Sequence, residues 1–257
     1  MKKFLYALVI IVVILPVVLC SCANPGPMIT RQFEYTDFVN VQVGSAFEAD
    51  ITPADTYSIS VTAPQNWFDS INVDKTGNTL EVGMEWGWNF WRNLGSNRPR
   101  VKITMPQLNN LDLSGATKSN VTGFKSTNDF KLSLSGASTL DLSIESYDTS
   151  LTVSGASTVK GQLNVHDIRL NLSGASTAVL SGTGNNLNLQ VSGASHATID
   201  DLEVKDARAE VSGASRASVS PMGTLDIHLS GASTLEYTGS PVIGTLDVTG
   251  ASSVKKK

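Results

Sequence analysis

The sequence has few of the residues on which common site chemistries depend. Its 257 residues include 2 cysteines and 3 histidines, and charged residues make up only 16%. Both cysteines, Cys20 and Cys22, lie near the N-terminus, so the rest of the chain can form neither a disulfide nor a cysteine-ligated metal site. The formal net charge of −4, without a basic patch, argues against a nucleic-acid-binding protein.

Aromatic residues are also scarce, at 7%, although 41% of the residues are hydrophobic. The apolar residues are therefore mostly aliphatic, while glycine, serine, threonine and asparagine abound. The length allows one long domain or two ordinary ones. This composition favours a β-structure with aliphatic side chains inside and small residues at its turns.

The most informative feature is a tetrapeptide that recurs eight times in the C-terminal part. Ser-Gly-Ala-Thr begins at Ser114, and the closing copy, Thr-Gly-Ala-Ser, begins at Thr249. The six Ser-Gly-Ala-Ser copies between them begin at Ser135, Ser154, Ser173, Ser192, Ser212 and Ser230. The steps between starts are 21, 19, 19, 19, 20, 18 and 19 residues. Such a period indicates a solenoid, in which each unit buries its apolar face against its neighbours.

Alternating segments flank each tetrapeptide. Leu132-Ser133-Leu134 precedes one copy and Leu140-Asp141-Leu142 follows it. Alternation of this kind is typical of strands, and the glycine between them allows a corner with positive φ. Two or three short strands per turn of about 19 residues predict an all-β fold, a parallel β-helix, with the tetrapeptide as a structural corner and not a nucleophile motif.

Residues 31–105 lack this period but still contain alternating segments, so we expect them to form an N-terminal cap or degenerate first coils. Residues 106–257 carry the repeats. Because the two segments are continuous and both strand-like, the sequence predicts a single domain over residues 31–257, preceded by a tether over residues 22–30.

The N-terminus is typical of an export signal over residues 1–21. Lys2 and Lys3 precede an apolar run from Phe4 to Leu19, which is shorter than the roughly 20 residues of a spanning helix. The following Leu-Cys-Ser-Cys looks like the lipobox of bacterial lipoprotein precursors, and Cys22, after the small Ser21, fits the lipidated position better than Cys20. We expect lipid chains on Cys22, palmitate among them, to hold the domain at a membrane.

One aromatic cluster interrupts the pattern. Trp86, Trp88 and Trp91 stand close together, interleaved with polar residues. Such rings can bind a sugar or a membrane interface, or they can cap the open end of the first coil, which is the interpretation we favour.

The tetrapeptide array, the strand-like Phe38-Val39-Asn40-Val41 and the run Val101–Leu108 together resemble the auto-transporter adhesin head domain family, often called the GIN domain. The resemblance covers roughly residues 34–254. It implies a right-handed β-helix on exported or lipid-anchored bacterial envelope proteins, and it transfers no catalytic residues.

The sequence itself offers no convergent set of titratable side chains. The polar position within the strand before each corner holds no carboxylates in adjacent turns, and His166, His196 and His228 occupy different positions of the repeat. We therefore expect no catalytic residue, no metal site and no cofactor. The prediction is a non-enzymatic envelope lipoprotein that binds an envelope polysaccharide or surface protein or associates with itself. The alternative is a polysaccharide lyase or hydrolase on the same scaffold.

Overall fold

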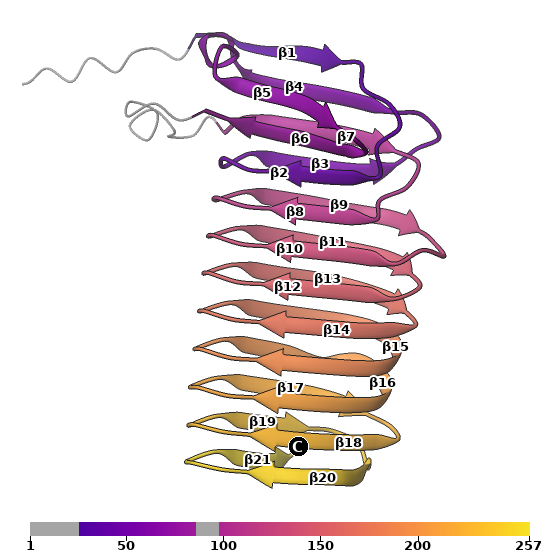
Figure 1. Ribbon diagram of the computed structural model, residues 1–257, viewed down its shortest axis with the longest axis vertical. Coiled ribbons are helices and arrows are strands. Elements are labelled where there is room, and N and C mark those ends of the chain that lie inside the picture. The colour runs from indigo at the N-terminus through magenta and orange to yellow at the C-terminus, as the bar shows by residue number, and fades with distance from the viewer. Residues whose placement is uncertain (1–25, 86–97) are drawn as a thin grey trace, which may run out of the picture.

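The computed structural model describes residues 26–85 and 98–257. In this part of the chain 21 strands form one continuous sheet that winds into a long stack of turns (Figure 1). The one helical element described is a 3-10 turn, η1 (Gln65–Trp67). The predicted all-β solenoid of about 19 residues per turn is confirmed.

Each repeat turn contributes two strands, one to each of two facing layers. The first layer contains β2 (Asn40–Val43), β6 (Thr79–Met84), β8 (Asn110–Leu113), β10 (Phe130–Leu134), β12 (Thr149–Val153), β14 (Asp167–Leu172), β18 (Thr224–Leu229) and β20 (Val242–Val248). The second contains β3 (Glu48–Pro53), β7 (Arg100–Met105), β9 (Lys118–Lys125), β11 (Thr139–Ser146), β13 (Thr158–Val165), β17 (Arg216–Pro221), β19 (Thr234–Tyr237) and β21 (Ser253–Lys256). Two long strands, β15 (Thr177–Val191) and β16 (His196–Val211), run through both layers.

The third short segment that the sequence suggested for some turns is not a separate strand. Leu163-Asn164-Val165 forms the end of β13, and the segment from Leu202 to Val204 lies within β16. No turn interrupts the extended backbone there, although in β16 the register shifts between Ile199 and Glu203, so that the alternation resumes one residue out of phase.

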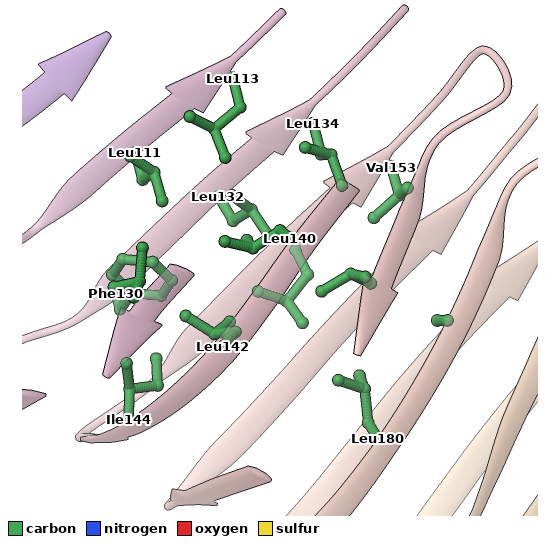
Figure 2. Packing of buried hydrophobic residues seen from close by; sticks show 14 of the residues in the cluster. Leu111, Leu113, Phe130, Leu132, Leu134, Leu140, Leu142, Ile144, Val153 and Leu180 are labelled. Atoms are coloured by element: carbon green, nitrogen blue, oxygen red, sulfur yellow. The ribbon is translucent and has the colours of Figure 1, made fainter. Parts of the chain in front are cut away.

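Equivalent side chains stack in register from one turn to the next. Parallel pairing aligns Leu111, Leu132 and Leu151 at one level. Figure 2 shows Leu111 and Leu132 at this level, with other aliphatic side chains filling the space between the layers. These three leucines are at most 3% exposed, so the aliphatic half of the alternation builds a continuous core along the stack.

The tetrapeptide forms the corner between the two layers. Its glycines have φ between 70° and 79°, and each glycine carbonyl accepts a hydrogen bond from the alanine N–H of the next corner, as in Ala156 N to Gly136 O at 2.7 Å. A Cβ on Gly155 would lie 2.4 Å from Gly136 O. Both the left-handed backbone and the close stacking therefore require glycine here.

The last residue of each tetrapeptide except the closing one is buried. Ser138, Ser157 and Ser176 are at most 1% exposed. The Ser138 hydroxyl donates to Ser135 O within its own corner at 2.8 Å, and Thr117 Oγ1 donates to Ser138 Oγ at 2.9 Å in the next turn. Hydrogen bonds between the hydroxyls of neighbouring corners thus form only at some steps, while backbone hydrogen bonds link every pair of neighbouring corners from Gly115 onward.

The N-terminal coils do not follow the order of the chain. Strands β2 and β3 pair in parallel with β8 and β9 on one side and with β6 and β7 on the other. The β2–β3 coil therefore lies between the β6–β7 coil, which follows it in the chain, and the β8–β9 coil, where the repeats begin (Figure 1).

Antiparallel strands cover this end of the stack. β1 (Met28–Phe33) pairs with β4 (Ser58–Pro64), β4 pairs with β7, and β5 (Ile71–Thr76) forms a hairpin with β6 around Gly77. Trp67 and Phe68 are buried beside them, at 7% and 6% exposure. The predicted N-terminal β cap is thus present as antiparallel strands. No helix in the described part of the chain is long and apolar enough to cross a membrane.

Candidate functional site

The two sites predicted from sequence lie outside the described residues. Cys22 precedes residue 26, and Trp86, Trp88 and Trp91 fall within residues 86–97. The aromatic segment connects β6 to β7, the connection that a tetrapeptide corner makes in the repeat turns. Both assignments therefore remain predictions.

The described surface carries a groove along the first layer. It has a volume of about 430 Å³ and takes its lining from six successive turns, so it runs parallel to the long axis for roughly 24 Å at the strand spacing of about 4.8 Å. We call it the axial groove. Its lining residues are Asp129–Lys131, Asp148–Ser150, Asp167–Arg169, Asn186–Asn188, Asp206–Arg208, Thr224 and Asp226.

A column of acidic and amide side chains forms one edge of the axial groove, where the chain enters the first layer in each turn. The column consists of Asp129, Asp148, Asp167, Asn186 and Asp206. Asp148 Oδ1 accepts from the backbone N–H of Asp167 at 3.2 Å, and Asp167 Oδ1 accepts from that of Asn186 at 3.2 Å. Each such aspartate thereby supports the next turn, and the Oδ2 atoms of Asp148 and Asp167 accept no hydrogen bond from any described residue.

A second column presents cations into the groove at every second turn. Register places Lys131, Ser150, Arg169, Asn188 and Arg208 at the same level. Arg208 forms an ion pair with Glu210 at 2.7 Å, whereas Lys131 and Arg169 form none within the described residues. Asn188 Oδ1 is buried and receives no hydrogen bond in this part of the structure, which leaves an acceptor without the donor that buried polar atoms require.

An aromatic pair stands beside the acidic column. The Tyr147 ring, in a residue that is 51% exposed, stacks on the His166 ring with centroids 4.8 Å apart and planes 4° apart. Backbone hydrogen bonds connect these positions, since His166 N donates to Tyr147 O at 2.7 Å. The pair offers a flat apolar surface next to polar donors and acceptors.

His166 also meets two carboxylates. Its Nδ1 lies 3.1 Å from Asp148 Oδ1 and 3.5 Å from Asp167 Oδ1, and the three ligand atoms all lie within 4.8 Å of one another. His228, in contrast, faces a single carboxylate, with Nδ1 3.8 Å from Asp247 Oδ2.

Hydrogen bonds keep two groove carboxylates ionised. The Thr224 hydroxyl, at 2.6 Å, and then its backbone N–H lower the pKa of Asp206 below its usual value. The backbone N–H of Thr245 similarly lowers the pKa of Asp226. Burial raises the pKa of Asp112, and its register neighbours Gln42 and Ser133 are not carboxylic acids.

The axial groove was not predicted, because the polar position within each strand holds no carboxylates in adjacent turns and the acids of the groove stand elsewhere in the repeat. Asp129, Asp148 and Asp167 stand one position before their strands' first inward residue, at a spacing of 19 residues. This spacing is the signal in the sequence that predicts the column. The histidines give no such signal, because they occupy different positions of the repeat and His166 meets its two acids only in the folded chain.

Comparison with known proteins agrees with the architecture. Residues 37–241 match the family described as "Putative auto-transporter adhesin, head GIN domain". The chain belongs to this family. A search of curated proteins gives no match.

Solved structures share the fold of this GIN domain at low sequence identity. A structure titled "Putative lipid binding protein" from Parabacteroides distasonis matches with a TM-score of 0.79 and 19% identity over 90% of this chain and 97% of its own. A "putative adhesin" from Parabacteroides merdae matches with a TM-score of 0.78 and 17% identity over 90% of this chain and 97% of its own. A "putative adhesin" from Bacteroides fragilis matches with a TM-score of 0.67 and 19% identity over 90% of this chain and 97% of its own. The family and these structures carry the names of adhesins or of a lipid-binding protein, and not of enzymes.

Proposed function

We propose that this GIN-domain protein is an envelope lipoprotein that holds an extended neutral glycan in the axial groove. The observation that carries the proposal is the continuous polar lining across six turns. One column offers carboxylate oxygens, and the other offers Lys131 and Arg169, which form no ion pair with any described residue. A polymer can follow such a groove because equivalent donors and acceptors recur along it. The family's adhesin name supports a binding role at the cell surface.

The charges of the lining favour a neutral chain over an anionic one. Five aspartates and three cationic residues line the groove, so acidic side chains exceed basic ones by two. Carboxylate, guanidinium and amide groups can each bond sugar hydroxyls, and the exposed Tyr147 ring can pack against a sugar face. A polyanion would meet net repulsion from the same lining.

A carbohydrate-active enzyme remains the second candidate, and the carboxylate column is the observation that favours it. Glycosidases need one carboxyl group that keeps its proton beside another that is ionised. Hydrogen bonds lower the pKa of Asp206 and Asp226, and Asp112, whose pKa is raised, has no carboxylate among its register neighbours. This arrangement supports binding over hydrolysis.

The glycan proposal predicts that groove variants lose polysaccharide binding. We expect the Tyr147→Ala/Arg169→Ala double variant to bind isolated neutral envelope polysaccharide at least about tenfold more weakly, a change of about 1.4 kcal/mol, because it removes the stacking surface and an unpaired cation. Binding of the full chain would be measured by affinity electrophoresis, with product analysis to detect cleavage.

Arg216→Ala is the matched control, since Arg216 is an exposed arginine on β17 in the opposite layer. Equal losses in both variants, or no loss in the double variant, would refute the groove as the site. A loss confined to a Trp86/Trp88/Trp91→Ala variant would assign binding to the aromatic cluster. Released oligosaccharides would instead establish the enzyme.

The lipid anchor is the other part of the proposal, and it rests on the lipobox-like sequence at Cys22. We expect Cys22→Ala to abolish incorporation of labelled palmitate and to shift the protein from the membrane to the soluble fraction, because lipid chains on Cys22 would be its means of attachment. Cys20→Ala, two residues away, should leave both readouts unchanged. Continued labelling of Cys22→Ala would exclude this anchor.

A further inference from the structure

The Asp148, His166 and Asp167 cluster stands apart from ordinary surface ion pairs because one imidazole nitrogen faces two carboxylates. His166 Nδ1 lies 3.1 Å and 3.5 Å from their Oδ1 atoms. Ligand atoms about 2.0–2.2 Å from a tetrahedral zinc ion are roughly 3.3–3.5 Å apart. The two distances fall close to this separation, and the two carboxylate oxygens lie within 4.8 Å of each other.

We propose that Asp148, His166 and Asp167 form a binding site for a divalent transition-metal ion such as Zn²⁺. One nitrogen and two oxygen ligands suit zinc, and three protein ligands leave a fourth position open. The inference goes beyond glycan binding, because the ion needs only these three side chains.

The surroundings fix the three ligands before an ion arrives. Tyr147 stacks on the imidazole and limits its rotation. The backbone N–H of Asp167 holds Asp148 Oδ1 at 3.2 Å, and the Asn186 side-chain amide holds Asp167 Oδ1 at 2.8 Å. Such neighbouring contacts orient metal ligands and reduce the ordering cost of binding.

The site also borders a place where a ligand can reach the ion. Asp148 and Asp167 both line the axial groove. The open coordination position can therefore take water or an oxygen atom from a bound molecule, and the ion would add positive charge to the acidic edge of the groove.

Zinc binding by the full chain tests the proposal. The protein would be purified without a histidine tag, in mild detergent, with Cys20→Ser and Cys22→Ser so that no thiolate can bind the metal. Calorimetric titration with Zn²⁺ alone should show one ion per chain, and Co²⁺ should give the visible absorption of an oxygen- and nitrogen-ligated site. His166→Gln should weaken zinc binding at least about tenfold.

His228→Gln is the matched control, because His228 faces one carboxylate instead of two. It should bind zinc as the parent does, and unfolding curves would verify that both variants fold. Absence of saturable binding in the parent, or equal binding by His166→Gln, would show that the cluster is only an ion pair. Because the titration contains no glycan, failure of either proposal can be recognised separately.

Discussion

Gly155→Ala should lower the free energy of unfolding by about 3 kcal/mol or more. Placing a β-carbon on a backbone with φ of 74° costs roughly 1–2 kcal/mol by itself. The new Cβ would also lie 2.4 Å from Gly136 O, the atom that accepts the Ala156 N–H. The corner must then shift, which weakens the backbone hydrogen bond between the two turns and adds to the loss. Denaturant unfolding followed by circular dichroism measures the change.

Gly77→Ala separates the two causes. Gly77 also has positive φ, 61°, but a Cβ there would meet no atom within 4 Å. Gly77→Ala should therefore lower the free energy of unfolding only by about the conformational cost, roughly 1–2 kcal/mol. If the two substitutions destabilise the protein equally, stacking of the corners is not what demands glycine in the repeat.

The corners show how much of the fold the sequence could predict. The repeat spacing, the glycine in each tetrapeptide and the alternation beside it are all local features, and together they predicted the turn length, the corner and the core side chains. They succeed because each turn contacts only its neighbours, so one local pattern repeated many times determines the whole stack.

The N-terminal coils show where local patterns fail. Residues 79–84 and 100–105 alternate as strands in the sequence, and they are strands in the structure. Nothing in the alternation indicates that the β6–β7 coil lies outside β2–β3, because that order depends on pairing between segments far apart in the chain. The antiparallel cap also depends on pairing between distant segments, since β4 pairs with both β1 and β7.

The axial groove lies between these two cases. The 19-residue spacing of Asp129, Asp148 and Asp167 was visible in the sequence and would have placed them in one column. The stacking of Tyr147 on His166 and the approach of Nδ1 to two carboxylates depend on loop geometry, which the repeat does not specify. Site chemistry is therefore less predictable here than the scaffold that supports it.

Leu151→Ala should cost about 2–5 kcal/mol, as expected for a leucine inside a packed core. Leu151 is fully buried between Leu132 and Leu170, its neighbours in register. Truncating it leaves a cavity that the flanking turns cannot close without losing their own hydrogen bonds. Thermal and denaturant unfolding would both report the loss.

Leu246→Ala is the comparison that isolates burial, since Leu246 occupies the same level on β20 but is 60% exposed. Its loss should be about 1 kcal/mol or less, because little apolar surface is removed from contact there. Strand pairing connects Leu151 to Leu246 at one level of the stack, because each turn between them places one residue in register with the next. These residues are Leu170, Leu189, Ala209 and Ile227. Equal losses at both positions would mean that a further surface covers Leu246 in solution, and that the last turn is as well packed as the middle of the stack.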